Sequence, residues 1–229
     1  MTTGQRYQSV LREIAEACAE AGRDPQDVAL VAVSKTVGPD EVAAAMQAGA
    51  RDFGENRPDQ LVQKHDAFPQ ANWHFIGNIQ SRRIRDVVGR AVLVHSLFEE
   101  RHARKIDEIA REAGIVQDVL LEVNVSGEES KGGVAPDKAA ALLETCVQLE
   151  NVRPRGLMTM APQGDLAVAQ RCFSDLRDLR DALRSTLDAD AAAAFAHLSM
   201  GMSEDWRCAV REGATIVRIG RAVFSDIEL

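Results

Sequence analysis

The sequence ALVAVSKT, residues 29–36, contains five apolar residues followed at once by serine, lysine and threonine. The composition of 29–33 predicts a buried strand, and the amphipathic stretch 39–48 predicts the helix after it. The same order then recurs along the chain. Further strands are expected over 51–53, 73–76, 91–95, 119–123, 153–157, 196–198 and 216–219.

Amphipathic helices are expected between those strands, over 59–65, 82–88, 99–113, 136–149, 165–187 and 204–211. Another helix is predicted over 3–21, with Gly22 as its stop. Its apolar residues at helical spacing are Val10, Ile14, Ala17, Cys18 and Ala21. The alanine-rich run 188–194 is typical of a helix end or a surface spacer.

Strands that alternate with helices imply a parallel sheet covered by helices. Eight such units in roughly 200 residues fit a small closed (β/α)8 TIM barrel. The alternative is an open doubly wound sheet, which would want a glycine-rich turn after its first strand, and residues 33–36 contain no GxGxxG. We therefore expect an α/β fold with one barrel domain over residues 1–229 and an extra N-terminal helix.

Composition and charge indicate which classes of protein the chain can belong to. The 229 residues carry a formal net charge of −8, and 45% are hydrophobic, as in soluble globular proteins. The acidic balance argues against nucleic acid and membrane partners, and no apolar run reaches the ~18 residues of a membrane span. The chain opens without an apolar signal segment, and its four cysteines form no CxxC pair. We expect a cytoplasmic protein with reduced thiols and no metal site.

Polar residues follow the expected strands at their carboxyl ends, where barrel enzymes carry their chemistry. Lys35 comes directly after the first strand, at the edge of the low-dielectric interior. A neutral amine there can attack a carbonyl carbon and form a Schiff base. The alternative is a lysine that extends into solvent or pairs with Glu55.

The last two strands end in Ser199-Met200-Gly201 and Gly220-Arg221, where barrels commonly hold a phosphate. Glycine lets backbone N–H groups approach an anion, and the serine adds a hydroxyl donor. These glycines could equally form tight turns only. A lysine that can react with an aldehyde, together with two segments that can bind a phosphate, points to pyridoxal 5′-phosphate or to a phosphorylated sugar as the ligand.

Arg218 lies within the last expected strand. Alternation places Arg218 on one face with Ile216, opposite Val217 and Ile219, and does not decide which face points inward. An inward guanidinium would lie beside the bound ring and would need a partner, because an unpaired buried charge is costly. An outward one would pair with an acidic residue of a helix.

Six motifs occur in order at the strand ends: VAVSK (31–35), FGEN (53–56), WHFIG (73–77), GLMTM (156–160), LSMGMS (198–203) and VRIG (217–220). Together they resemble the pyridoxal phosphate homeostasis protein family, the YggS/PROSC group, which is related to the N-terminal barrel of alanine racemase. The resemblance runs over essentially the whole chain. It implies a single barrel that binds pyridoxal 5′-phosphate as an aldimine on Lys35 and serves intracellular homeostasis of the cofactor and its delivery to apoenzymes.

The resemblance also implies roles for the other site residues. Asn56 would lie near the cofactor ring and Arg218 beside the pyridine nitrogen. An arginine there disfavours protonation of that nitrogen and weakens the ring as an electron sink, which suits a holder of the cofactor. The positions implied around the phosphate are Ser199, Met200, Gly220 and Arg221.

Three places depart from the family pattern. Asn56 is followed by Arg57-Pro58-Asp59, where Pro58 can still open a helix. Gln80 is followed by Ser81-Arg82-Arg83, which keeps a basic, anion-attracting rim. Arg221 stands where the family usually has a small residue, and it could reach the phosphate or face solvent.

Catalysis is the alternative function. A weak amino-acid racemase would need two proton-transfer groups, and in the racemases one is a tyrosine from a C-terminal β domain of the partner subunit. We expect no such domain here, since the chain ends at Leu229 and its one tyrosine, Tyr7, falls in the first helix. His74 and His197 are expected near the active mouth, in structural roles. A Schiff-base aldolase for a sugar phosphate is a further alternative, and a monomer, or at most a weak dimer, is expected.

Overall fold

The computed structural model describes residues 1–128 and 131–225. Within these residues, eight parallel strands follow one another around a closed barrel, and the last strand pairs with the first. The predicted closed barrel is therefore confirmed, and the open sheet is excluded. The strands are β1 (Ala29–Val33), β2 (Asp52–Glu55), β3 (Asn72–Phe75), β4 (Leu93–Leu97), β5 (Gln117–Glu122), β6 (Val152–Met158), β7 (His197–Ser199) and β8 (Ile216–Ile219).

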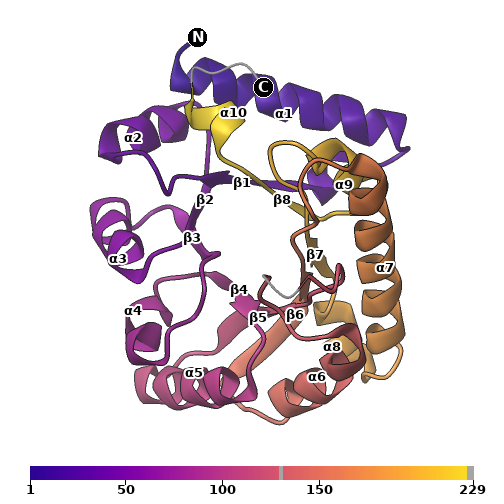
Figure 1. Cartoon of the computed structure of the whole chain (residues 1–229). Coiled ribbons are helices and arrows are strands. Elements are labelled where there is room, and N and C mark those ends of the chain that lie inside the picture. Colours follow the sequence, from indigo (N-terminus) through magenta and orange to yellow (C-terminus); the bar gives the residue numbers. More distant parts are fainter. Residues whose placement is uncertain (129–130, 226–229) are drawn as a thin grey trace.

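The helices surround the barrel (Figure 1). They are α1 (Thr3–Glu20), α2 (Pro39–Gln47), α3 (Pro58–Ala67), α4 (Ile84–Val87), α5 (Glu100–Ala113), α6 (Ala139–Val147), α7 (Leu166–Arg184), α8 (Ala189–Ala194), α9 (Trp206–Arg211) and α10 (Arg221–Phe224). Short 3₁₀ turns occupy Pro25–Asp27, Ser81–Arg83 and Pro136–Lys138. Residues 129–130 and 226–229 of the expected domain lie outside the described residues.

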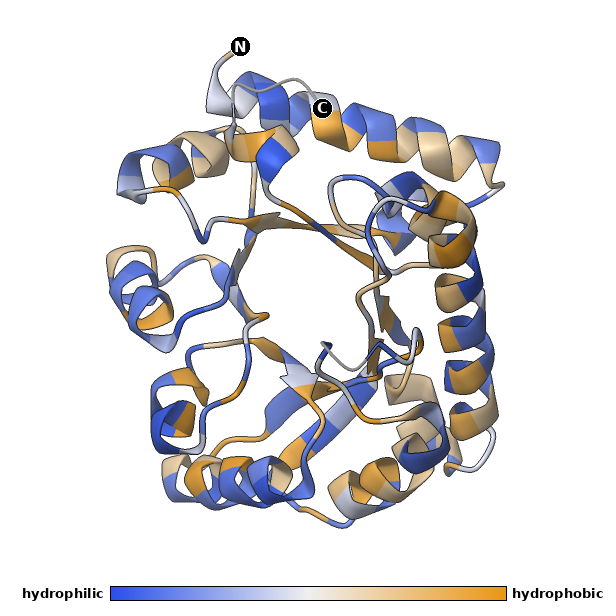
Figure 2. Ribbon diagram, in the orientation of Figure 1, coloured by the Kyte–Doolittle hydropathy of each residue, from blue (hydrophilic) through white to orange (hydrophobic). Residues whose placement is uncertain are grey.

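Two apolar layers make up the core. The larger layer lies between the strands and the helices, and Figure 2 shows the helices apolar on the side that faces the barrel. The smaller layer fills the barrel interior with Val31, Leu93, Leu120, Met158 and Ile216. Parallel strands covered on both faces need apolar residues on both, which explains the unbroken apolar runs in the sequence.

Helix α1 closes the ring of helices beside β1 and β8, where it packs on α2, α9 and the single-turn helix α10 (Figure 1). A capping box starts it: the Gln5 N–H donates to Thr2 Oγ1 at 3.2 Å, and the Thr2 N–H donates to Gln5 Oε1 at 2.8 Å. Its predicted inward residues are buried except for the half-buried Ala21, and Gly22 ends it with φ of 66°.

The structure differs from the sequence prediction near the C-terminal end. The helix predicted over 165–187 ends earlier, at Arg184, and the alanine-rich run predicted as a helix end or spacer forms a helix of its own, α8. Asp188 caps that helix by accepting the Ala191 N–H at 2.9 Å, and alanine has the highest helix propensity. The short tail expected after residue 219 contains α10.

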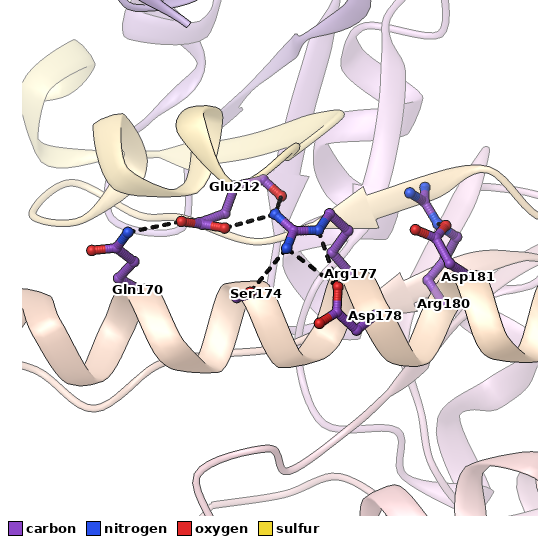
Figure 3. Close-up of polar contacts among 7 residues, drawn as sticks. All are labelled: Gln170, Ser174, Arg177, Asp178, Arg180, Asp181 and Glu212. Carbon is purple, nitrogen blue, oxygen red and sulfur yellow. Dashed lines mark hydrogen bonds and ion pairs between the residues drawn. The ribbon is translucent and has the colours of Figure 1, made fainter.

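A polar cluster on the outside ties α7 to the end of α9 (Figure 3). Arg177 Nη1 donates to Glu212 Oε2 at 2.7 Å, and Gln170 Nε2 donates to Glu212 Oε1 at 2.9 Å. Arg177 Nη2 also donates to Ser174 Oγ at 2.9 Å on its own helix. Glu212 precedes β8, so the cluster fixes the entry to the last strand.

Candidate functional site

A cavity of about 730 Å³ opens at the carboxyl ends of the strands. Five of the seven predicted site residues line it. They are Lys35, Asn56, Arg218, Gly220 and Arg221. The other two, Ser199 and Met200, are fully buried and are not part of its wall. The predicted strand ends therefore meet at one cavity, but their sequence does not separate the residues that line it from those buried behind it.

The lysine at the end of β1 is held by a buried cluster behind it. Lys64 Nζ donates to the Ser34 backbone oxygen at 2.6 Å and to Glu55 Oε1 at 2.5 Å, and Ser34 Oγ donates to the same carboxylate oxygen at 2.7 Å. Lys64 and Glu55 are 2% and 0% exposed. Among the described residues the ion pair of Glu55 is with Lys64, and the Lys35 side chain is exposed in the cavity instead.

Asn56 follows β2, and its backbone lies directly against Gly77, the second residue after β3. A Cβ atom on Gly77 would lie 1.9 Å from the Asn56 backbone oxygen, so only glycine fits there. Ser96 Oγ donates to the Gly77 oxygen at 2.5 Å from the neighbouring strand. Pro58 is the first residue of α3, as predicted, so the departure from the family pattern leaves the helix start intact.

Arg218 points into the barrel, which settles the choice that alternation left open. It is 4% exposed, Nη1 donates to Ser199 Oγ at 2.6 Å, and Nη2 donates to the Thr159 backbone oxygen at 3.0 Å. Burial lowers the pKa of this guanidinium to about 10, against the opposing effects of Asp205 and Glu122. It remains a cation at neutral pH.

Ser199 and Met200 are engaged within the barrel. The Ser199 hydroxyl contacts Arg218 and lies 2.9 Å from His95 Nδ1, and the Met200 N–H donates to the Ile216 oxygen at 3.1 Å. Their predicted place around a phosphate stays a prediction. Ser203, four residues after Ser199, lines the cavity from the loop that follows β7.

Gly220 and Arg221 form the wall after β8. Gly220 lies against β1, since a Cβ atom there would approach the Val33 backbone oxygen to 3.1 Å. Arg221 stands at the exposed rim and pairs with Glu204, Nη2 to Oε1, at 2.6 Å. Asp205 is tied to the loop by accepting the Met202 N–H at 2.6 Å.

Glu122, at the end of β5, is a buried acid that no sequence motif marks. It is 2% exposed, and its Oε2 has no hydrogen-bond partner among the described residues. Burial raises its pKa to about 7, although the Arg218 charge opposes the shift. It is not part of the cavity wall and lies next to Gly132, where an added Cβ atom would approach Glu122 Oε1 to 3.3 Å.

The expectation that His74 and His197 lie near the active mouth is wrong. Both line a second cavity at the opposite end of the barrel, of about 720 Å³. The second cavity lies at the amino ends of the strands. His197 is the first residue of β7, and the His74 side chain contacts Asp52, the first residue of β2. The interior histidine that does approach the site is His95, which no sequence motif marked.

Other features of the described residues bear on alternatives. Tyr7 is 5% exposed on α1 and does not line the cavity. In the described ranges, no group of three or more His, Cys, Asp or Glu side chains is placed to hold a metal ion. Residues 1–128 and 131–225 also contain no helix with the length and apolar character of a bilayer span.

Comparison with known proteins gives a consistent family. The profile of the alanine racemase N-terminal domain matches residues 8–227. The pyridoxal phosphate homeostasis protein of Aquifex aeolicus is 41% identical over 229 residues, 99% of each chain, and that of Pseudomonas aeruginosa is 43% identical over 227 residues, 97% of this chain and 95% of that protein. The structure of PipY from Synechococcus elongatus with PLP bound has a TM-score of 0.80 and 34% identity, and the match covers 93% of this chain and 100% of that one. The chain therefore belongs to the alanine racemase N-terminal domain family and, within it, to the pyridoxal phosphate homeostasis proteins.

Proposed function

We propose that this protein binds pyridoxal 5′-phosphate reversibly through Lys35 and takes part in its homeostasis by handing it to apoenzymes in the cytoplasm. One observation carries the proposal. A strand-end amine, Lys35, and a buried guanidinium, Arg218, line the same cavity of about 730 Å³. The names of the relatives and the PLP-bound PipY structure support it.

The residues present fit the chemistry of this cofactor. The Lys35 amine would condense with the aldehyde carbon to form an imine with release of water, and hydrolysis would reverse the step. The Ser34 carbonyl, held by Lys64, fixes the backbone from which that side chain extends. Lys35 and Asn56 are both exposed, so the aldehyde has a direct path in and out.

The ring nitrogen and the phosphate would meet different parts of the wall. Arg218 offers only N–H donors, so a pyridine nitrogen against it keeps its lone pair and stays unprotonated. That arrangement weakens carbanion stabilisation and favours holding the cofactor over catalysis. For the phosphate, the wall after β7 and β8 offers Gly220, Arg221 and the Ser203 hydroxyl. The roles of Ser199 and Met200 there remain predictions.

A spectroscopic titration tests binding through Lys35. Cofactor added to the apo-protein should produce an imine absorption band that borohydride bleaches. Lys35→Ala should lose the band and bind at least about 10-fold more weakly, a difference of ~1.4 kcal/mol. Lys105→Ala, on the outer face of α5 and paired there with Glu108, is the matched control and should behave as wild type. An unchanged band in Lys35→Ala would refute the assignment.

Delivery needs a separate experiment. Holo-protein is mixed with a pyridoxal-phosphate-dependent apoenzyme in the presence of an agent that traps free cofactor. Direct transfer predicts that reactivation continues under trapping, whereas the same amount of free cofactor gives none. If trapping abolishes reactivation by the holo-protein, direct delivery is wrong and only buffering remains. Sedimentation of the holo-protein tests the expected monomer.

A further inference from the structure

A chain of hydrogen bonds crosses the barrel interior from the cavity that Lys35 and Arg218 line to the second cavity at the opposite end, which Asp52 and His74 line. It joins Arg218 Nη1 to Ser199 Oγ (2.6 Å), Ser199 Oγ to His95 Nδ1 (2.9 Å), His95 Nε2 to His74 Nδ1 (2.9 Å) and His74 Nε2 to Asp52 Oδ1 (3.1 Å). The first four members are 4%, 0%, 0% and 6% exposed. Five side chains from five strands thus form one continuous path.

The two ends fix the direction of the chain. Arg218 can only donate and the Asp52 carboxylate can only accept. With both imidazoles neutral, the Ser199 hydroxyl must therefore donate to His95 Nδ1, and each imidazole must carry its proton on Nε2. Burial, the neighbouring His74 and the Arg218 charge lower the pKa of His95 well below its ordinary value, which keeps it neutral.

Arg218 needs such support because of where it lies. None of the described residues gives it an ion pair at hydrogen-bond distance. Its hydrogen-bond partners are the Ser199 hydroxyl and the Thr159 carbonyl oxygen. Asp205 and Glu122 act on it only from further away. A buried cation without a paired anion is costly unless oriented dipoles stabilise it. Ser199, with its proton committed to His95, turns its lone pairs towards the guanidinium.

We infer that His95 is a positioning residue that acts through Ser199 on Arg218, and that His74 and Asp52 fix the tautomer of His95 in which it can do so. This rests on the function proposed above, in which Arg218 faces the ring nitrogen of the cofactor. The chain holds the guanidinium in place from behind, so that its remaining N–H groups face the cavity.

The first test needs no cofactor. Long-range ¹H–¹⁵N spectra of the apo-protein, labelled at histidine, report which ring nitrogen carries the proton. We expect the neutral Nε2–H tautomer for His95 at neutral pH. A His95 protonated at Nδ1, or an imidazolium, overturns the directed chain. Because the measurement uses apo-protein, it stands even if the proposed cofactor binding fails.

The second test is a double-substitution cycle on the affinity for pyridoxal 5′-phosphate and on the pH midpoint of the bound cofactor's absorption change. Ser199→Ala and His95→Leu should each weaken binding about 10-fold, the effect of one buried hydrogen bond, and each should raise the midpoint as the ring nitrogen protonates more easily. The doubly substituted protein should lose no more than the larger single effect, because both act on one path. Additive losses would show that His95 does not act through Ser199.

A conservative variant separates positioning from packing. In His95→Asn the side-chain oxygen can take the place of Nδ1 and accept the Ser199 hydroxyl. We expect it to restore most of the affinity lost in His95→Leu and to return the midpoint towards wild type. If His95→Asn is as impaired as His95→Leu while its circular dichroism and melting match wild type, the inference is wrong.

Discussion

At the scale of single residues, the position of Lys35, which the sequence singles out, depends on Lys64, which the sequence does not. Lys64 lies in a helix whose composition marks no buried charge, yet it reaches beneath β1 to Glu55 and the Ser34 carbonyl. His95 is similar: it sits within an apolar strand and becomes significant only when β4 faces β3 and β7. Neither could be predicted from the sequence, because each partner comes from a different element.

Substitution of Lys64 should show how much the buried Lys64–Glu55 ion pair contributes to stability. In Lys64→Met the Glu55 carboxylate is left buried without its cation, and we expect the free energy of unfolding to fall by about 3–5 kcal/mol in urea denaturation. The double variant Lys64→Met/Glu55→Gln removes both charges and should recover much of that loss. A single variant as stable as wild type would contradict the account.

Glu122 should make stability depend on pH. Its folded-state pKa is about 7, above the ordinary value of 4.5, so its favourable contribution is present below pH 4.5 and is lost as pH rises through about 7. Glu122→Gln removes this loss. The stability of the variant relative to wild type should therefore rise by about 3 kcal/mol between pH 4.5 and neutral pH. The free energies of unfolding of both proteins are measured by denaturation across this pH range. A difference between them that does not change with pH would show that the Glu122 pKa is not raised in the folded state.

At the scale of elements, the strands and most helices follow from apolar runs and their polar ends, and so does the ring of residues around the cavity. The orientation of β8 does not. Its inner residue Ile216 and its outer residues Val217 and Ile219 are all apolar, because parallel strands bury both faces. The apolar pattern therefore does not show which face of β8 points into the barrel. Only closure of the barrel places Arg218 inside.

The contact between the ends of β2 and β3 gives a prediction of its own. In Gly77→Ala the new Cβ atom would overlap the Asn56 backbone oxygen, so the turn after β2 must move. We expect cofactor affinity to fall about 10-fold or more, measured by absorption titration, and stability to fall by several kcal/mol. Gly38→Ala is the control, because its Cβ would meet only the Glu41 carboxylate at 3.4 Å. Equal affinities for the two variants would contradict the expected link.

At the scale of the whole molecule, the closed barrel makes α1 part of the same folding unit as the strands. Helix α1 covers the junction of β1 and β8 with α2, α9 and α10, and Ile14 on its inner face is 2% exposed. Small closed barrels have no free sheet edge on which part of the structure could remain folded alone. The expected single domain therefore predicts one cooperative transition.

Ile14→Ala tests that unity. It should lower the free energy of unfolding by about 3 kcal/mol, the usual effect of such a core truncation, and the loss should appear equally in circular dichroism and in the fluorescence of the buried Trp73 and Trp206. Glu16→Ala, exposed on the same helix, should change stability little. Separate transitions for the two probes would show that α1 folds apart from the barrel.

The proposed function depends on one bond, between the Lys35 amine and the aldehyde carbon of pyridoxal 5′-phosphate. The most direct measurement is reduction of the cofactor-loaded protein with borohydride, followed by proteolysis and mass spectrometry of the peptides. We expect one stoichiometric pyridoxyl phosphate adduct, on the peptide that contains Lys35. An adduct on another lysine, with Lys35 unmodified, would contradict it.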